Sequence, residues 1–514
     1  MRADLTGDAG HVYPPSALVE THTAWIALVA DVALKVKKPV RFPFLDFSTP
    51  ERREAACRRE VELNRRLAPD AYLGVWTVLG PGGAASEHLV AMRRMPAERS
   101  LAALVERDDP RGAAAIDPIA DQLAAFHRGA ERGRHVDRRC ERDAVRALWT
   151  ENFREMRTSG VFPASDLDRA EALAGRFLDG REVLFVERIH AGAGCDGHGD
   201  LQASDIFVLD DGPRILDCIE FDDRYRYGDV AADVAFLVMD LERLGRTDLA
   251  RRLLMRYEDA SGTTLPRALV EHFVAYRAQV RAKVAALRAR QEVDPVRRDA
   301  DTALARQLLD LCLEHLERGD VRVALVGGLP GSGKSTLGDH LGDATGATVL
   351  RSDVIRRELL GEPEPQSGSS SGYGAGRYGR DQVGATYDEL LERARHELAR
   401  GRSVVLDASW SSGVRRAQAR ELARNVHAHT VELVCEVDDE TAAGRIRRRA
   451  EAATDASEAT AAIRARMADD FDDWPEAAPI DTRPSVDAFL PAALAAWQRA
   501  TATSPASATR RADR

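Results

Sequence analysis

Cysteine is scarce in this sequence and follows no pattern. Six cysteines occur in 514 residues, with neither a C-x-x-C pair nor a spacing typical of zinc ligands. This excludes a disulfide framework and favours a reducing compartment. The first residues lack the basic and apolar regions of a signal peptide, and no run of about 18 apolar residues is long enough to span a bilayer. We therefore predict a cytoplasmic protein without a membrane segment.

Positive charge is in deficit. Lys and Arg number 73 against 83 Asp and Glu, a net charge of −10, which counts against a general nucleic-acid-coating protein. The 44% hydrophobic and 30% charged residues are typical of a globular chain that buries cores. At roughly 100–200 residues per domain, the length corresponds to about two to four domains, so a single compact domain is excluded.

The order of predicted elements changes along the chain. Short strand-like runs first mix with helical patches and then give way to nearly continuous helix, an α+β order. Beyond residue 319, apolar strands alternate with helices, as in a parallel sheet wound with helices. We predict an α+β domain over 11–300, a connecting helix over 301–320, an α/β domain over 321–500, a Gly/Ser-rich insertion over 361–380 and a disordered tail over 501–514.

The strongest motif opens the second domain. Residues 328–335, GLPGSGKS, match G-x-x-x-x-G-K-[ST] and stand between an apolar strand and a helix, the context that a phosphate-binding loop needs. Glycines let backbone N–H groups surround phosphate oxygens, and the helix N-terminus adds positive potential. The lysine reaches the β- and γ-phosphates, and the serine offers a hydroxyl to Mg²⁺. The predicted ATP-binding residues are Gly328, Gly331, Ser332, Gly333, Lys334, Ser335 and Thr336.

Two carboxylates and an arginine extend this motif to a kinase prediction. Asp353 ends a strand and is positioned to accept the proton of an attacking hydroxyl, with Arg356 holding the substrate or a phosphate. The alternative is that Asp353 caps a helix and Arg356 is solvated. Asp407 ends the apolar strand RSVVLDAS, where a carboxylate organises Mg²⁺ together with Ser335.

The region of about 320–500 resembles the P-loop kinases of small molecules and the 5′-kinase domain of polynucleotide kinases, through GLPGSGKS and D-x-x-R. The resemblance implies phosphoryl transfer from ATP to a hydroxyl and leaves the acceptor open. Four arginines in GRIRRRAE resemble the lid of such kinases, although a solvated helix face explains them nearly as well: Arg445, Arg447, Arg448 and Arg449.

A second constellation lies in the first domain. The segment HGDLQASD, residues 198–205, precedes a predicted hairpin, as the catalytic loop of protein kinases does. In that comparison Asp200 holds the position of the catalytic base and Asp205 that of a metal-binding Asn, while Glu220 in the following strand holds that of the second metal-binding carboxylate.

Three features upstream and downstream fall in the matching order. Lys35 in VALK is placed to contact the nucleotide phosphates, and Lys37 lies on the same strand face and can replace it. Glu60, on a predicted helix, is placed to pair with that lysine. Asp229 and Asp233 open a helix whose acidic N-terminus would brace the catalytic loop. The segment before Lys35 contains no glycine-rich phosphate loop.

Together these motifs resemble the aminoglycoside phosphotransferase and choline kinase family over about residues 20–290. The resemblance implies a protein-kinase-like fold and a MgATP-dependent kinase. The chain departs from the family pattern at two positions, with Asp205 in place of Asn and Glu220 in place of Asp. Both residues retain oxygen ligands for Mg²⁺, but Asp205 adds negative charge and Glu220 moves its carboxylate by a methylene.

We therefore predict an ATP- and Mg²⁺-dependent kinase of two domains that phosphorylates a hydroxyl of a small molecule, with neither nucleic acid nor membrane as partner. The alternatives are a nucleotide-dependent regulator, in which the first domain senses a ligand without turnover, and a polynucleotide 5′-kinase, which rests on D-x-x-R alone. The departures at Asp205 and Glu220 and the missing glycine-rich loop favour the regulator.

Overall fold

The computed structural model describes residues 17–21, 23–42, 45–80, 83–361, 380–452 and 461–499. The chain forms two compact units, the first made of Met1–Asp168 and Phe185–His315, the second of Arg169–Leu184 and Leu316–Arg514. The change of unit after His315 lies close to the predicted boundary, but the short segment 169–184 from the first half belongs to the second unit. The predicted tail and nearly all of the predicted insertion lie outside the described residues.

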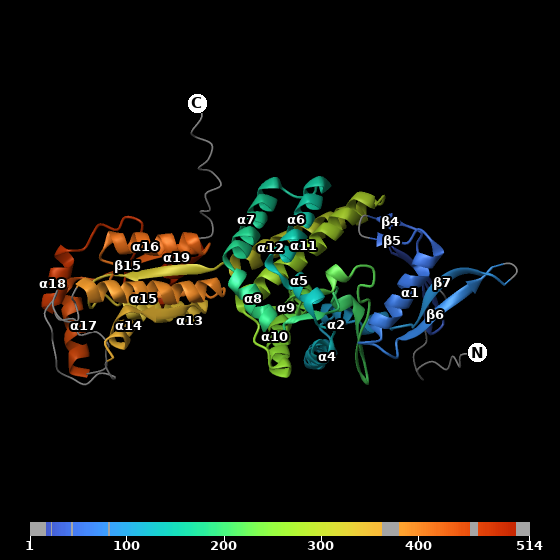
Figure 1. The fold of residues 1–514 in the computed structure, drawn as a ribbon, viewed down its shortest axis with the longest axis horizontal. Coiled ribbons are helices and arrows are strands. Elements are labelled where there is room, and N and C mark those ends of the chain that lie inside the picture. The colour runs from blue at the N-terminus through green and yellow to red at the C-terminus, as the bar shows by residue number, and fades with distance from the viewer. Residues whose placement is uncertain are drawn as a thin grey trace, which may run out of the picture. The chain divides into compact units, whose positions relative to one another are not determined.

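The first unit begins with an antiparallel sheet whose strands lie in the order β1-β2-β3-β7-β6. One helix, α1 (Pro50–Asn64), packs on β6 and β7 through a core that includes Cys57, Val61 and Val90 (Figure 1). Thr49 and Pro50 start this helix, because the Thr49 hydroxyl accepts a hydrogen bond from the Arg52 N–H and proline is suited to the first turn. The strands are β1 (Ala17–Glu20), β2 (Ala24–Val29), β3 (Val32–Lys37), β6 (Tyr72–Leu79) and β7 (Ala85–Arg93), with a small pair β4 (Arg41–Phe42) and β5 (Leu45–Asp46).

The rest of the first unit is mainly helical around a group of short strands. Its most buried helix, α9 (Val230–Arg243), packs against α10 and α11. The short strands are β8 (Gly194–Asp196), β9 (Ile206–Leu209), β10 (Gly212–Ile215) and β11 (Tyr227–Asp229). The other helices of this unit are α2 (Leu101–Glu106), α3 (Pro110–Ala114), α4 (Ile116–Gly129), α5 (Arg134–Cys140), α6 (Arg142–Ser159), α10 (Thr247–Ser261) and α11 (Arg267–Gln291). Three helices have residues in both units: α7 (Ala164–Gly180), α8 (Glu182–His190) and α12 (Pro295–Arg318).

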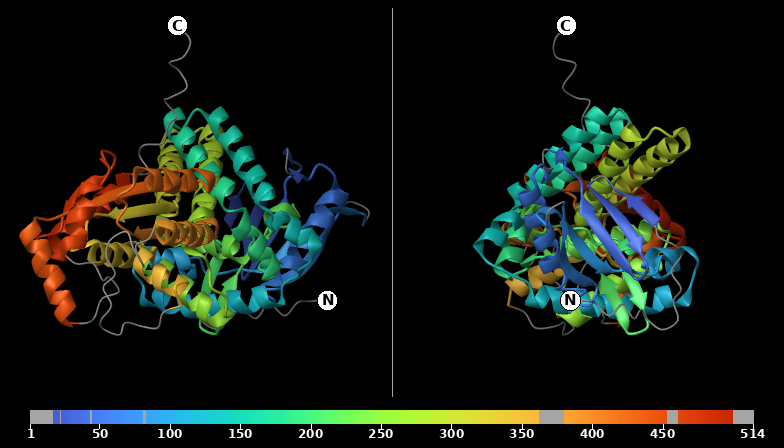
Figure 2. Two further views of the ribbon diagram at one scale, coloured as in Figure 1. Left: turned by 60° about the vertical axis from the view of Figure 1, so that its left-hand side comes forward. Right: turned by 90° about the vertical axis from the view of Figure 1, so that its right-hand side faces the viewer.

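The second unit is a parallel sheet in the order β13-β14-β12-β15-β16 with helices on either side (Figure 2). Its central strand, β12 (Arg322–Gly327), is wholly buried, which explains the unbroken apolar run of the sequence. The other strands are β13 (Thr348–Arg351), β14 (Val404–Asp407), β15 (His429–Glu436) and β16 (Ala478–Asp481). The helices are α13 (Lys334–Thr345), α14 (Ser352–Leu359), α15 (Arg380–Ala399), α16 (Gly413–Asn425), α17 (Asp439–Ala452), α18 (Ala461–Asp469) and α19 (Val486–Arg499).

The segment 169–184 is held in the second unit by one buried arginine. Arg181 is 1% exposed, and its guanidinium donates to the backbone carbonyl oxygens of Leu398 at 2.6 Å and Val426 at 3.0 Å. It also donates to the carbonyl oxygens of Gly180 and His427. Since a buried guanidinium needs many acceptors, this arrangement fixes the segment strongly.

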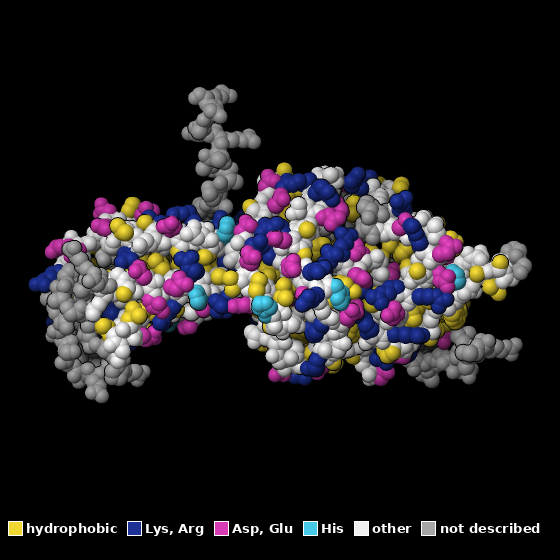
Figure 3. All heavy atoms as spheres, viewed as in Figure 1, with side chains coloured by type: hydrophobic (Ala, Val, Ile, Leu, Met, Phe, Trp, Pro, Cys, Tyr) yellow, Lys and Arg dark blue, Asp and Glu magenta, His cyan; other side chains and the backbone are white. Residues whose placement is uncertain are grey.

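No helix among the described residues is long and apolar enough to cross a membrane. On the face shown in Figure 3, the basic and acidic side chains are intermixed rather than gathered into a stripe of one sign.

Candidate active sites

The phosphate-binding motif forms a tight loop between β12 and α13. Gly328, Gly331 and Gly333 have φ angles of +133°, +80° and +88°, a region that favours glycine. A methyl group at Gly328 or Gly331 would lie 2.7 or 2.8 Å from a backbone carbonyl oxygen. Only glycine therefore fits at these two positions, and the backbone can surround a small anion.

Lys334 and Ser335 begin α13 at the carboxyl edge of the sheet. The Lys334 ammonium contacts only the Leu329 carbonyl oxygen, at 3.3 Å, among the described hydrogen bonds. Burial raises the pKa of Asp407, at the end of β14, while Lys334 and a hydrogen bond from Ser335 oppose that rise. A cationic lysine, a hydroxyl and a carboxylate thus meet at the start of one helix.

The loop has the properties that MgATP requires. The Ser332 hydroxyl is buried and has no hydrogen-bond partner within the described part of the chain. The neighbouring helix N-terminus favours phosphate oxygens, and the Ser335 and Asp407 oxygens are the kind of ligand that Mg²⁺ prefers. Thr336 is exposed in the first turn of α13. These residues fit a nucleotide phosphate with its metal ion.

Asp353 and Arg356 lie in the first turns of α14. Their side chains form an ion pair of 2.8 Å, and Asp353 is close enough to Asp407 to raise the pKa of that carboxyl. The N-cap of this helix is Arg351, so Asp353 lies inside the first turn and is not the cap. Both residues also influence the pKa of Tyr387, whose hydroxyl contacts Ser409 at 3.2 Å.

The structure distinguishes among the four arginines of α17. Arg445 donates to the Thr482 hydroxyl and carbonyl oxygens, at 3.1 and 2.6 Å, and Thr482 in turn donates to the Ser332 carbonyl oxygen at 2.6 Å. Arg447 and Arg448 are exposed, and the side chain of the fourth, at position 449, lies outside the described residues. Arg445 is therefore the member connected to the phosphate loop.

A fifth arginine supports the loop and was missed by sequence reasoning. Arg464 on α18 is 8% exposed and donates to the Pro330 carbonyl oxygen at 2.8 Å and to Asp439. Nothing in its local sequence, AAIRARMAD, separates it from a solvated helical arginine. Only the return of α18 to the loop shows its role.

In the first unit, Lys35 and Lys37 project from one face of β3 and share one carboxylate. Glu60 on α1 is fully buried and pairs with Lys35 at 2.9 Å and with Lys37 at 2.7 Å. Each lysine has a second partner, Asp217 at 2.7 Å for Lys35 and Glu220 at 2.5 Å for Lys37. Burial opposes the lysine charges, but these carboxylates outweigh it and raise both lysine pKa values.

The HGD segment brings three aspartates within electrostatic reach of one another. Burial raises the pKa of Asp200 to about 6; Arg281 opposes this rise, and Asp217 adds to it. Burial also raises the pKa of Asp205, with Asp217 and Asp200 as further causes. Lys35 lowers the pKa of Asp217, which is half-exposed and has a φ of +64°. Sequence reasoning missed Asp217, because in the segment LDCIEF it assigned the second metal-binding position to Glu220.

The predicted metal ligands of the first unit are separated. Glu220 is turned to Lys37, whereas Asp205 lies near Asp200 and Asp217. Within the described ranges, no group of three or more His, Cys, Asp or Glu side chains is arranged to hold a metal ion. The arrangement shown does not support Glu220 and Asp205 as a joint metal site, because the positive charge of Lys37 competes for the Glu220 carboxylate.

Asp233 braces the HGD segment, as its position at the start of α9 predicts. Its carboxylate accepts hydrogen bonds from the backbone N–H groups of His198 and Gly199, both at 2.8 Å, and contacts His127 at 2.9 Å. Burial opposes its ionisation, but these hydrogen bonds hold the pKa of Asp233 well below its usual range. The other predicted residue, Asp229, caps α9 and pairs with Arg188.

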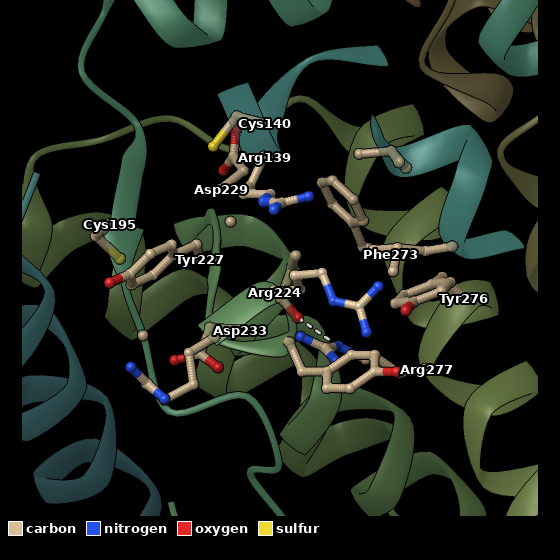
Figure 4. A pocket seen from close by; sticks show the side chains of 17 residues that line it. Arg139, Cys140, Cys195, Arg224, Tyr227, Asp229, Asp233, Phe273, Tyr276 and Arg277 are labelled. Carbon is tan, nitrogen blue, oxygen red and sulfur yellow. Dashed lines mark hydrogen bonds between the residues drawn. The ribbon is translucent and has the colours of Figure 1, made fainter. Parts of the chain in front are cut away.

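A small cavity lies behind this loop (Figure 4). It has a volume of about 40 Å³ and is lined by residues of α9 and α11 and of the segment 224–229. Asp233, Arg224 and Arg277 are among the lining side chains. The volume suits ordered water rather than a substrate.

The N-terminal sheet lacks a glycine-rich phosphate loop, as the sequence indicates. The strands β1 and β2 are joined by residues 21–23, which contain no glycine, and Ala30 occupies the β2–β3 turn with a φ of +48°.

Comparison with known proteins assigns both units. Residues 40–270 match the phosphotransferase enzyme family, and residues 323–473 match an AAA domain family. Uncharacterized proteins of Mycobacterium bovis and Mycobacterium tuberculosis are 42% identical to this chain over 484 residues, 94% of this chain and 95% of theirs. The chain belongs to their family.

The family combines an aminoglycoside-phosphotransferase-like domain with a P-loop kinase-like domain, so the predicted resemblance and fold classes are confirmed. Solved structures similar to parts of the chain include a gluconokinase from Sinorhizobium meliloti 1021 (18% identity, 36% of this chain and 94% of that chain, TM-score 0.26). A choline/ethanolamine kinase family protein from Mesorhizobium loti shares 13% identity over 60% of this chain and 94% of its own, with a TM-score of 0.35. The assignment rests on the family models and the sheet topology, not on these distant likenesses.

Proposed function

We propose that this protein transfers the γ-phosphoryl group of MgATP to a hydroxyl group of a small molecule. The observation that carries this proposal is that Lys334, Ser335 and Asp407 lie together at the start of α13, beside a loop in which only glycine fits at positions 328 and 331. The kinase-type families of both domains support phosphotransfer.

In the second unit, the glycine loop and Lys334 would hold the nucleotide phosphates, and Ser335 with Asp407 would hold Mg²⁺. When bound, MgATP supplies the phosphoryl group and neutralises part of its charge. Asp353 accepts the proton of the acceptor hydroxyl, and Arg356, paired with it at 2.8 Å, orients the carboxylate and the acceptor. The placement of Asp353 near the Asp407 carboxylate supports this role.

In the first unit, Asp200 orients and deprotonates the acceptor hydroxyl. Its pKa of about 6 leaves it ionised at neutral pH yet basic enough to take a proton. Lys35 and Lys37 would contact the nucleotide phosphates, with Glu60 aligning both. Asp233 holds the backbone of His198 and Gly199, which fixes the position of Asp200.

A second function, nucleotide-dependent regulation, is favoured by two features of the first unit. Each lysine of β3 already has two carboxylate partners, and the sheet has no glycine-rich loop. A nucleotide must compete with Asp217 and Glu220 for these lysines. In this alternative the second unit binds or hydrolyses ATP, and the first binds a ligand without turnover.

The test uses the full chain with radiolabelled ATP and a panel of sugars, amino alcohols, nucleosides and 5′-hydroxyl oligonucleotides. Loss of transfer in Lys334→Ala with survival in Asp200→Ala locates the chemistry in the second unit, and the opposite result locates it in the first. If the chain binds ATP but phosphorylates no acceptor, the regulator replaces the enzyme. Labelling of oligonucleotides alone would identify a polynucleotide kinase.

A further inference from the structure

Two side chains from later elements hold carbonyl oxygens of the glycine-rich loop between β12 and α13. The Thr482 hydroxyl, just after β16, donates to the Ser332 carbonyl oxygen at 2.6 Å. The Arg464 guanidinium, on α18, donates to the Pro330 carbonyl oxygen at 2.8 Å. Both donor residues are buried, with exposures of 2% and 8%. The loop is therefore held at two positions by residues that lie far from it in the sequence.

Arg445 fixes the direction in which the Thr482 hydroxyl donates. It donates to the hydroxyl oxygen of Thr482 at 3.1 Å and to the carbonyl oxygen of the same residue at 2.6 Å. A guanidinium can only donate, and a hydroxyl carries a single proton. Since the Thr482 oxygen accepts from Arg445, its own proton is the one directed to the Ser332 carbonyl oxygen.

The two carbonyl contacts orient two peptide groups of the loop. No cis peptide bond occurs in the described ranges, and in a trans peptide the C=O and the following N–H point in opposite directions. Because the Ser332 carbonyl points to Thr482, the Gly333 N–H points away from Thr482. For the same reason the Gly331 N–H points away from Arg464. Among the hydrogen bonds of the described residues, neither glycine N–H has a protein acceptor.

Other donors of the loop are also left for a ligand. The Ser332 hydroxyl, between the two glycines, is 1% exposed and has no hydrogen-bond partner in the described part of the chain. Lys334 adds a positive charge where α13 begins. Successive backbone N–H groups beside a helix N-terminus favour phosphate oxygens. The Asp407 carboxylate, which interacts with Lys334 and Ser335, is the group assigned above to Mg²⁺.

We propose that Thr482 and Arg464 are positioning residues of the nucleotide site. By holding two carbonyl oxygens away from the ligand, they direct the N–H groups of Gly331 and Gly333 to phosphate oxygens, which neither side chain touches itself. The proposal rests on the proposed binding of ATP in the second unit. Because donors that are oriented before binding need no ordering when the ligand arrives, loss of either contact weakens phosphate binding.

The experiment measures binding of MgATP and of inorganic tripolyphosphate to the full-length protein by calorimetry. Binding that Lys334→Ala loses belongs to the loop. Thr482→Val removes the hydroxyl at nearly constant volume, and Thr482→Ser retains it. The matched control is Thr386→Val on α15, because this threonine is 1% exposed and donates to the Gln382 carbonyl oxygen of its own helix at 2.8 Å.

A second pair of variants tests the other contact. Arg464→Met removes the donor to the Pro330 carbonyl oxygen, whereas Arg466→Met removes the same charge from an exposed position of α18. Thermal denaturation of every variant separates a loss of phosphate binding from a loss of folded protein.

We expect both ligands to bind about tenfold to a hundredfold more weakly in Thr482→Val and in Arg464→Met. Binding should be unchanged in Thr482→Ser and in the two controls. In a transfer assay, the KM for ATP should rise by the same factor while kcat stays constant, as for a contact that serves binding alone.

Unaltered binding in Thr482→Val or in Arg464→Met overturns the role of that residue. Failure of serine to restore binding, an equal loss in the matched control, or the absence of any binding that depends on Lys334 overturns the proposal as well. The expected pattern of phosphate binding without transfer to any acceptor would refute the kinase function but not the positioning role.

Discussion

Replacing Asp200 by Asn should make the first unit more stable while removing its activity. Burial raises the pKa of this carboxyl from 3.8 to about 6, so the folded state disfavours the ionised form. At 1.36 kcal/mol per unit, a shift of about two units corresponds to about 3 kcal/mol. Asp200 is only partly buried, and Gln202 donates to it at 2.9 Å. We therefore expect Asp200→Asn to gain about 1–2 kcal/mol at pH 7.5.

The sign of the pH dependence follows from the raised pKa. The favourable contribution of Asp200 is fully present below pH 3.8 and is lost as the pH rises through about 6. The advantage of the Asn variant should thus be largest above pH 6 and vanish near pH 4. Thermal denaturation of the wild-type protein and the Asn variant across this pH range measures the difference in stability. Hydrogen exchange in the first unit assigns the difference to that unit.

A matched control is Asp210→Asn, because Arg99 lowers the pKa of that exposed carboxyl and no penalty is relieved there. The same reasoning predicts that transfer by the N-terminal site falls as the pH drops below about 6, because Asp200 becomes protonated. An Asn variant that is less stable at pH 7.5, or an advantage independent of pH, would refute the burial argument.

Three further substitutions probe other parts of the molecule. Lys37→Met should cost about 3–5 kcal/mol in thermal denaturation, since it leaves buried carboxylates without a partner, and more than Lys35→Met, whose second partner is half-exposed. Arg181→Met should cost about 3 kcal/mol by leaving carbonyl oxygens unpaired, seen as faster hydrogen exchange in the second unit but not in the first. Gly331→Ala, whose methyl group would lie 2.8 Å from a carbonyl oxygen, should weaken ATP binding in calorimetry at least tenfold, whereas Gly444→Ala, where space is open, should not.

Local sequence patterns predicted the glycine-rich loop because its conformation depends on consecutive residues. Glycine at three positions and the lysine that begins the helix follow directly from the backbone conformation that the loop requires. The pairing of Lys35 and Lys37 with Glu60 was also accessible, since the lysines alternate along one strand and the glutamate lies on the next helix. Such short-range rules need no knowledge of the full fold.

Contacts between distant segments were not accessible in this way. Asp217 reaches Lys35 across 182 residues, and Arg464 reaches the phosphate loop across 134. Arg445 differs from Arg447 and Arg448 only by its side of the helix relative to Thr482. A pattern of charges in the sequence indicates which residues are polar. The partner of each residue depends on which distant segments of the chain the fold brings next to it.

The sequence by itself determined that the chain has two domains of different fold class and where the main motifs lie, because strand periodicity, glycine spacing and helix starts are local properties. Only the tertiary structure decided that the segment 169–184 belongs to the second unit, that Glu220 pairs with Lys37, and that Asp217 pairs with Lys35. The physical reason is that a buried charge pairs with the groups that lie next to it in the folded chain. Because such a charge has lost its hydration, leaving it unpaired would strongly destabilise the fold.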